Sequence, residues 1–185
     1  GKKYLALDDR DKRMDAVKDI VALQTYLKTK KEIDAERVAL IGASYGGYMT
    51  LACLAFFPDL WAAGVDIVGF SNLVTFLENT AVWRRALREA EYGFLKTDRE
   101  LLEKISPFNF TQNIKAPLFI IHGKNDPRVP VAESEQMYRK LREHGVPSEL
   151  LIYDDEGHGL SKLKNRRDAF PKVADFLDKH LKREA

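Results

Sequence analysis

Cysteine is nearly absent from this chain of 185 residues, and the single Cys53 excludes a disulfide within the chain. It lies in an apolar stretch, where we expect a buried and unreactive thiol. One free cysteine fits a reducing compartment, so we expect a cytoplasmic location. The first residues, Gly1-Lys2-Lys3, are neither a start methionine nor a signal peptide, so we expect any targeting signal to lie upstream of them.

Long apolar runs and an excess of one charge are also missing. No apolar run approaches the roughly 18 residues that indicate a membrane helix. The 30 basic and 28 acidic side chains leave a formal net charge of +2, which gives no electrostatic basis for binding nucleic acid or an anionic membrane. No His, Cys, Asp and Glu cluster has metal-ligand spacing, and no glycine loop matches a phosphate cradle, so we expect neither a metal nor a cofactor.

The pattern that remains is an alternation of helices and short apolar strands. Strands are predicted at residues 38–41, 63–68, 117–121 and 149–153. Helices are predicted from Asp8 or Asp9 to residue 29, and at residues 46–57, 131–144 and 168–182. Continuous apolar strands separated by helices favour a parallel sheet with helices on both faces, which is an α/β fold. We therefore expect one domain over residues 1–185, with a lid-like, partly helical insertion at about 71–115.

The most informative motif is Gly42-Ala43-Ser44-Tyr45-Gly46, which lies between a predicted strand and a predicted helix. This is the context of the G-x-S-x-G elbow, in which a strained turn presents a nucleophilic serine. We expect Gly42 and Gly46 to let the strand and the helix approach closely, because neither has a Cβ. The motif alone is equally consistent with a glycine-rich turn that has no catalytic role.

Two later residues complete a constellation with Ser44. Asp126 lies in the loop after the third predicted strand, and His158 lies in the loop after the fourth. A serine hydroxyl needs a base within hydrogen-bond reach, and the base needs an orienting acid. The chain order of Ser, Asp and His is that of α/β-hydrolases. The sequence therefore predicts a serine hydrolase with a triad of Ser44, Asp126 and His158.

Other acids and histidines are weaker candidates. Asp126 could serve only as a turn former before Pro127. The rival acids lie so close to His158 in the sequence that a well-aimed bond to its ring is harder to form: Asp154, Asp155 and Glu156. His158 could be a surface-loop histidine, although its flanking glycines fit a crowded site. We expect His122 to be packed or structural, whereas His144 and His180 sit at helix ends.

With these residues in place, the chain resembles the catalytic domain of the prolyl oligopeptidase family, and most of all its acylaminoacyl-peptidase and dipeptidyl-peptidase branches. The similarity covers essentially all 185 residues and is carried by residues 42–49, 122–130 and 156–159. Tyr45, directly after the serine, is similar to these branches. The resemblance implies an α/β-hydrolase fold.

The resemblance also implies a role for each site residue. Ser44 would be the nucleophile that forms an acyl-enzyme, His158 the general base and then acid, and Asp126 its orienter. The backbone N–H of Tyr45 would form half of the oxyanion hole, and Val68 and Phe70 would line the pocket beside the scissile bond. The implied reaction is hydrolysis of short peptides or acyl-peptides. A carboxylesterase of the same fold is the alternative, because the same triad serves esters.

The chain also departs from the family pattern. Members of the family have further strands before the elbow, with a His-Gly-Gly-type loop that supplies the other oxyanion donor, and often a β-propeller. Nothing in this sequence matches them, so we expect only the C-terminal portion of the fold, without the N-terminal segment or propeller of the parent protein. Strand 38–41 would then be an exposed apolar edge that invites pairing with another copy. A third reading is therefore a catalytically weak fragment that acts as a folding or association unit.

Overall fold

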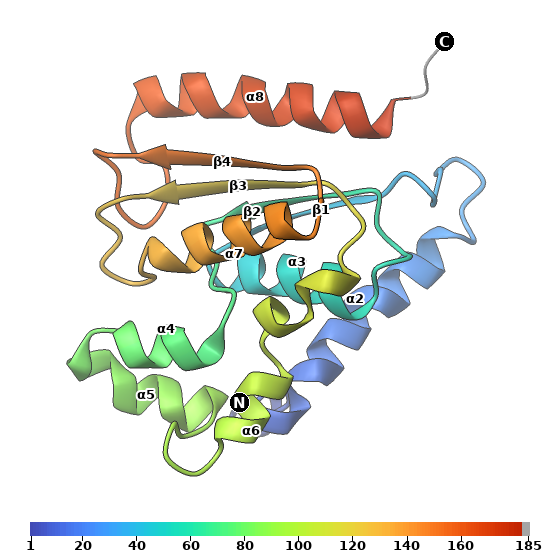
Figure 1. Ribbon diagram of the computed structural model, residues 1–185. Coiled ribbons are helices and arrows are strands. Elements are labelled where there is room, and N and C mark those ends of the chain that lie inside the picture. Colours follow the sequence, from blue (N-terminus) through green and yellow to red (C-terminus); the bar gives the residue numbers. More distant parts are fainter. Residues whose placement is uncertain (183–185) are drawn as a thin grey trace.

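The computed structural model describes residues 1–182, whose centre is a four-stranded parallel sheet in the order β1-β2-β3-β4 (Figure 1). The strands are β1 (Ala39–Ala43), β2 (Ala63–Ile67), β3 (Leu118–Gly123) and β4 (Ser148–Tyr153). In register, Ile41 pairs with Val65, which pairs with Phe119. The parallel strands with helices between them confirm the predicted α/β class, because each return to the next strand requires a crossover.

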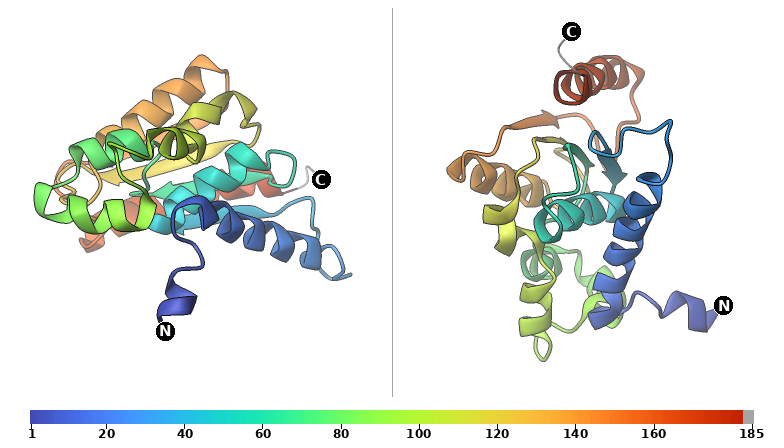
Figure 2. Two further views of the ribbon diagram at one scale, coloured as in Figure 1. Left: turned by 90° about the horizontal axis from the view of Figure 1, so that it is seen from below. Right: turned by 90° about the vertical axis from the view of Figure 1, so that its right-hand side faces the viewer.

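Helices cover both faces of the sheet. The helical segments are α1 (Lys2–Leu5), η1 (Arg10–Lys12), α2 (Arg13–Leu27), α3 (Tyr45–Phe56), α4 (Leu73–Asn79), α5 (Val82–Tyr92), α6 (Arg99–Lys104), η2 (Pro107–Asn113), α7 (Ala132–Glu143) and α8 (Leu163–Leu181). Helix α8 lies alone on one face, whereas α2, α3 and α7 lie on the other (Figures 1 and 2). None of the helices in residues 1–182 is both long and apolar enough to cross a membrane.

Strand β3 shows why its sequence is continuously apolar. Every residue of β3 is buried. Leu118 and Ile120 belong to the larger core with α3 and α7, whereas Phe119 and Ile121 pack beneath α8. Because successive side chains point to opposite faces, a strand that is covered on both faces needs apolar residues at every position.

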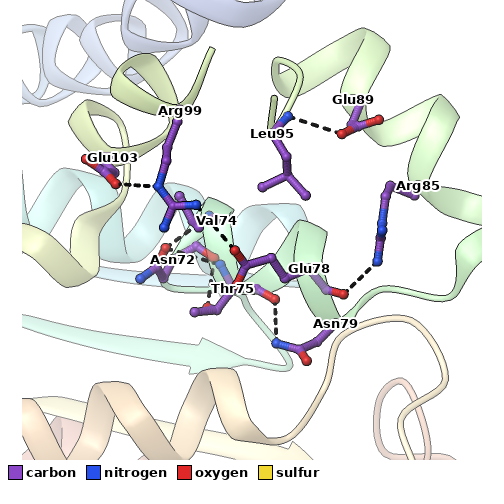
Figure 3. Close-up of polar contacts among 10 residues, drawn as sticks. All are labelled: Asn72, Val74, Thr75, Glu78, Asn79, Arg85, Glu89, Leu95, Arg99 and Glu103. Carbon is purple, nitrogen blue, oxygen red and sulfur yellow. Dashed lines mark hydrogen bonds and ion pairs between the residues drawn. The ribbon is translucent and has the colours of Figure 1, made fainter. Parts of the chain in front are cut away.

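The segment 71–115 forms four helical elements, α4, α5, α6 and η2, on the side of the sheet opposite α8 (Figure 1). Asn72 begins α4, where its side-chain oxygen accepts the backbone N–H of Val74 at 3.0 Å. Arg99 of α6 forms an ion pair with Glu103 of the same helix at 3.0 Å and another with Glu78 of α4 at 3.4 Å (Figure 3). Helices α4 and α6 are thus joined by an ion pair. The lid-like role of this segment stays a prediction.

Two helices begin at different positions from those predicted. Helix α2 starts at Arg13 rather than at residues 8 or 9, because Arg10 has a φ of 52° and residues 10–12 form a separate 3-10 turn. Helix α8 starts at Leu163, five residues earlier than predicted, and contains Pro171. Pro171 is exposed, so water can bond the carbonyl that this proline leaves without an N–H partner.

Candidate active site

Ser44 occupies the turn between β1 and α3, in a strained backbone conformation. Its φ is 58° and its ψ is −117°, values that L-residues rarely adopt. The backbone N–H of Ser44 donates to the carbonyl of Ile67 at 2.8 Å, which ties the turn to the end of β2. The structure therefore places Ser44 at the carboxyl-terminal ends of the strands.

Of the glycines around Ser44, Gly42 and Gly47 are tightly packed, whereas Gly46 is not. A Cβ on Gly42 would lie 2.0 Å from the carbonyl oxygen of Gly46, so Gly42 does permit the close approach of strand and helix. A Cβ on Gly46 would meet nothing within 4 Å, so the expectation for Gly46 is wrong. The second close approach belongs to Gly47, where a Cβ would lie 2.2 Å from the Oδ1 atom of Asp66.

Asp126, His158 and Ser44 form one continuous hydrogen-bonded chain. The Nδ1 atom of His158 lies 2.7 Å from Oδ2 of Asp126, and its Nε2 atom lies 2.8 Å from Oγ of Ser44. An ionised carboxylate only accepts, so Nδ1 carries the proton and donates it to Asp126. The lone pair of Nε2 then faces Ser44 and accepts its hydroxyl proton.

The Asp126 carboxylate is buried and receives donors on both oxygens. Its Oδ1 atom accepts the backbone N–H groups of Arg128 and Val129, at 2.7 and 3.0 Å. Burial acts to raise the pKa of Asp126, but hydrogen bonds from His122, His158 and these backbone groups outweigh it and lower the pKa well below the ordinary value. Asp126 is therefore ionised across the neutral range.

Glu156 holds the loop that carries His158. Its carboxylate accepts the Ser161 hydroxyl at 2.7 Å, the Lys162 backbone N–H at 2.8 Å and the Asn165 amide at 2.8 Å. Burial alone would raise the pKa of Glu156, but these hydrogen bonds hold it at about 2. The sequence presented Glu156 only as a rival acid, whereas the structure gives it a part in shaping the loop.

The remaining rival acids also bond elsewhere. Asp154 pairs with Lys124, and Asp155 pairs with Lys162. Among the four histidines, His144 lies at the C-terminal end of α7 and His180 in the last turn of α8, as expected. His122 is fully buried, which confirms that it is packed.

Tyr45 is the first residue of α3, so its backbone N–H belongs to the first turn, which has no acceptor within the helix. Its ring faces the guanidinium of Arg13, 5.0 Å from the ring centroid, and its hydroxyl donates to Asp8 at 3.3 Å. Arg13 has no exposed surface, and it also lies 4.5 Å from the ring centroid of Tyr92. Sequence reasoning missed Arg13, because an arginine in an amphipathic helix is ordinarily solvated.

Val68 and Phe70 follow β2, and both are buried. Val68 has a φ of 50°. The ring of Phe70 stacks between Tyr48 and Phe76, with centroid separations of 5.0 and 4.2 Å. Direct contact of these two residues with a substrate stays a prediction.

Cys53 lies within α3 and is 1% exposed, which confirms the expected burial. Burial raises the pKa of its thiol to about 12, so the thiol is unreactive at neutral pH.

Known proteins of similar sequence and fold are peptidases. The chain is 36% identical over 169 residues to dipeptidyl peptidase family member 6 of Caenorhabditis elegans, covering 88% of this chain and 23% of that protein. It is 40% identical over 145 residues to dipeptidyl aminopeptidase BIII of Pseudoxanthomonas mexicana, covering 76% of this chain and 21% of that protein. The structure of an acylaminoacyl peptidase from Pyrococcus horikoshii matches with a TM-score of 0.83 at 28% identity, over 91% of this chain and 28% of that one.

These matches have two consequences. The chain spans less than a quarter of the length of the two curated relatives, 23% and 21%. The chain has the α/β-hydrolase fold of such peptidases, with a four-stranded parallel sheet at its centre. The sequence pattern of the prolyl oligopeptidase family matches residues 1–184, and the chain therefore belongs to that family.

Proposed function

We propose that this chain carries the catalytic triad of a serine peptidase, with Ser44 as nucleophile, His158 as general base and Asp126 as its orienter. The observation that carries the proposal is the continuous chain of hydrogen bonds, 2.7 Å from Asp126 to His158 and 2.8 Å from His158 to Ser44. Both distances lie within the reach that nucleophile activation requires.

The protonation states give the order of events. His158 Nε2 takes the proton of Ser44 as its Oγ attacks the carbonyl carbon of the substrate. The resulting imidazolium is stabilised by the Asp126 carboxylate and then donates its proton to the leaving amine. An acyl-enzyme on Ser44 remains, and water activated by His158 hydrolyses it to regenerate the serine.

Tyr45 supplies one donor for the oxyanion of the tetrahedral intermediate. Its backbone N–H stands at the first position of α3, where the helix dipole adds partial positive charge. The loss of one oxyanion donor typically costs about 100- to 1,000-fold in rate. Because the second donor that the family resemblance implies is not matched in this sequence, we expect slow turnover by this chain alone.

The substrates that we propose are short peptides or acyl-peptides. Their support is the family, together with relatives named dipeptidyl peptidases and acylaminoacyl peptidases. The test is labelling of the chain by a fluorophosphonate probe, with Ser44→Ala as control. Labelling of the parent but not of Ser44→Ala supports the assembled triad, whereas a chain that is not labelled is an inert fragment. Turnover of acyl-alanine or dipeptide anilides supports the peptidase, and turnover of p-nitrophenyl acetate alone supports the esterase.

We further propose that β1 pairs with a second copy of the chain. Strand β1 forms an edge of the sheet within residues 1–182, and Ile41 on this strand is 57% exposed. Next to it lies an apolar groove, lined by Ile20, Leu40 and Met49 among others. Unpaired N–H and C=O groups beside an apolar surface favour strand pairing.

A further inference from the structure

A second histidine, His122, lies beside the triad and has no part in the proposed reaction. It belongs to β3, and its ring is fully buried. Its Nε2 atom lies 3.0 Å from the carbonyl oxygen of Val129, and its Nδ1 atom lies 2.7 Å from Oγ of Ser134. Both ring nitrogens are therefore in fixed contacts.

These contacts determine where the ring carries its proton. A carbonyl oxygen only accepts hydrogen bonds, so Nε2 of His122 carries a proton and donates it to Val129. In the neutral ring, Nδ1 accepts the hydroxyl proton of Ser134, which lies in the first turn of α7. Strand β3 and helix α7 thus hold the ring in one orientation.

The N–H of His122 also faces the proposed triad acid. Its Nε2 atom lies 3.4 Å from Oδ2 of Asp126, which is the oxygen that accepts the proton of His158. Oδ2 therefore lies between two imidazole N–H groups, while Oδ1 accepts two backbone N–H groups. Each oxygen of the carboxylate is held from two sides.

We propose that His122 is a positioning residue, whose Nε2–H fixes the rotation of the Asp126 carboxylate so that Oδ2 stays aimed at His158. This inference rests on the proposed function, because it assigns His122 a role through the triad acid. The bond from the same N–H to Val129 closes the loop of residues 126–129 around the carboxylate.

Other buried ionisable groups face this arrangement. Asp66 of β2 interacts electrostatically with His122, and burial raises the pKa of Asp66 to about 7. Glu133, beside Ser134 in α7, interacts with Asp66 in turn, and it accepts the backbone N–H groups of Ser71 and Asn72 at 3.0 and 2.9 Å. A pH profile of His122 variants must therefore be compared with that of the parent chain over the same range.

The test compares His122→Leu, which removes the donor, with His122→Gln, which restores an N–H near the Nε2 position. The rate of labelling of Ser44 by a fluorophosphonate is measured against pH, with His144→Gln as control because His144 is exposed at the end of α7. We expect His122→Leu to react about tenfold more slowly, the fold-change that corresponds to the net contribution of one hydrogen bond. We expect His122→Gln to recover to within about threefold, and His144→Gln to match the parent.

The pH profile distinguishes positioning from a merely structural role. Without the His122 N–H, the Asp126 carboxylate has one donor fewer, so its negative charge stabilises the protonated imidazolium of His158 more strongly. The acidic limb of the profile should therefore move to higher pH in His122→Leu and return in His122→Gln. A folded His122→Leu chain with the parent rate and limb would overturn the proposal. The proposal would also be overturned if His122→Leu lost labelling rate without a shift of the acidic limb and His122→Gln did not restore the rate.

A measurement on the parent chain needs neither activity nor a folded variant. The ¹⁵N chemical shifts of the His122 ring report which nitrogen carries the proton. We expect a proton on Nε2, and a ring protonated on Nδ1 alone overturns the proposal. If the parent chain is not labelled at all, the proposed function fails, while the NMR result still decides the orientation of His122.

Discussion

Two non-glycine residues at the carboxyl-terminal ends of neighbouring strands adopt positive φ. Ser44 after β1 has a φ of 58°, and Val68 after β2 has a φ of 50°. Such conformations cost on the order of 1–3 kcal/mol each and persist only where the surroundings impose them. The Ser44 N–H donates to Ile67 and the Val68 N–H donates to Ile121, each at 2.8 Å. The edge that presents the serine is therefore held by backbone bonds that run from strand to strand.

Replacing Asp126 with asparagine tests the orientation of His158. An amide can donate to Nδ1, which favours the tautomer with its proton on Nε2, and that nitrogen then cannot accept the Ser44 proton. We expect the rate of fluorophosphonate labelling to fall by roughly 10³- to 10⁴-fold, as in serine proteases when the triad aspartate is changed. Asp154→Asn is the matched control, because within residues 1–182 that carboxylate forms its one ion pair with the exposed Lys124. Equal labelling of both variants would contradict the role of Asp126.

The raised pKa of the buried Asp66 carboxyl leads us to expect that the stability of the chain depends on pH. Burial raises its pKa to about 7 in the folded chain, from an ordinary value of about 3.9 when unfolded. Between these values the folded state binds a proton that the unfolded state releases, so the free energy of unfolding falls as pH rises through this window. An asparagine side chain cannot ionise, so the free energy of unfolding of Asp66→Asn lacks this pH dependence. The difference in free energy of unfolding between Asp66→Asn and the parent should therefore rise by more than about 1 kcal/mol between about pH 5 and about pH 8. Denaturant titrations at both pH values check this, and a constant difference would contradict it.

The sequence was sufficient to single out the three residues that the structure joins by hydrogen bonds, Ser44, Asp126 and His158, because each lies at the end of an apolar strand in a recognisable local pattern. Contacts between residues far apart in the chain could not be predicted from these local patterns. Nothing local indicates that Arg13 is buried against Tyr45, or that His122 faces Asp126 from the end of β3. Gly46 and Gly47 are adjacent in the sequence, and only the packing of Asp66 shows which of them must lack a side chain.

At the scale of elements, the close approach of β1 and α3 depends on Gly42. A Cβ at this position would lie 2.0 Å from the backbone of Gly46, which no side-chain rotation relieves. We expect Gly42→Ala to lower the free energy of unfolding by about 1–3 kcal/mol, the typical cost of overpacking. The matched control is Gly46→Ala, where a Cβ meets nothing and helix propensity favours alanine by about 1 kcal/mol. Thermal melts of the two variants should move in opposite directions, and equal losses would refute this account.

Strand positions were predicted within about two residues, because apolar runs and turn residues mark them directly. Helices α3 and α7 start within one residue of their predicted positions, whereas α2 and α8 start several residues away, and for α8 the reason is a contact with another part of the chain. Asn165, in the first turn of α8, donates to Asp155 and Glu156 at 2.9 and 2.8 Å. These acids belong to the loop after β4, so the position of the first turn depends on the folded loop rather than on a local capping signal.

At the scale of the whole molecule, the free edge of β1 sets the expected behaviour in solution. Ile41 is 57% exposed beside the apolar groove of α2 and α3, and within residues 1–182 no strand pairs with that edge. A lysine on an edge strand discourages pairing with another sheet. We therefore expect the parent chain to self-associate in sedimentation velocity, and Ile41→Lys to shift it toward the monomer.

The control for this prediction is Leu163→Lys, which removes a comparably exposed apolar side chain from α8. Helix α8 covers the opposite face of the sheet from α2 and α3 (Figure 2). If association arose from general surface hydrophobicity, both lysine variants would reduce it equally. If it arises from β1, only Ile41→Lys does so, and Leu163→Lys sediments like the parent. A parent chain that stays monomeric at every concentration and still turns over peptide anilides rapidly would contradict both the edge pairing and the expected weakness of the isolated chain.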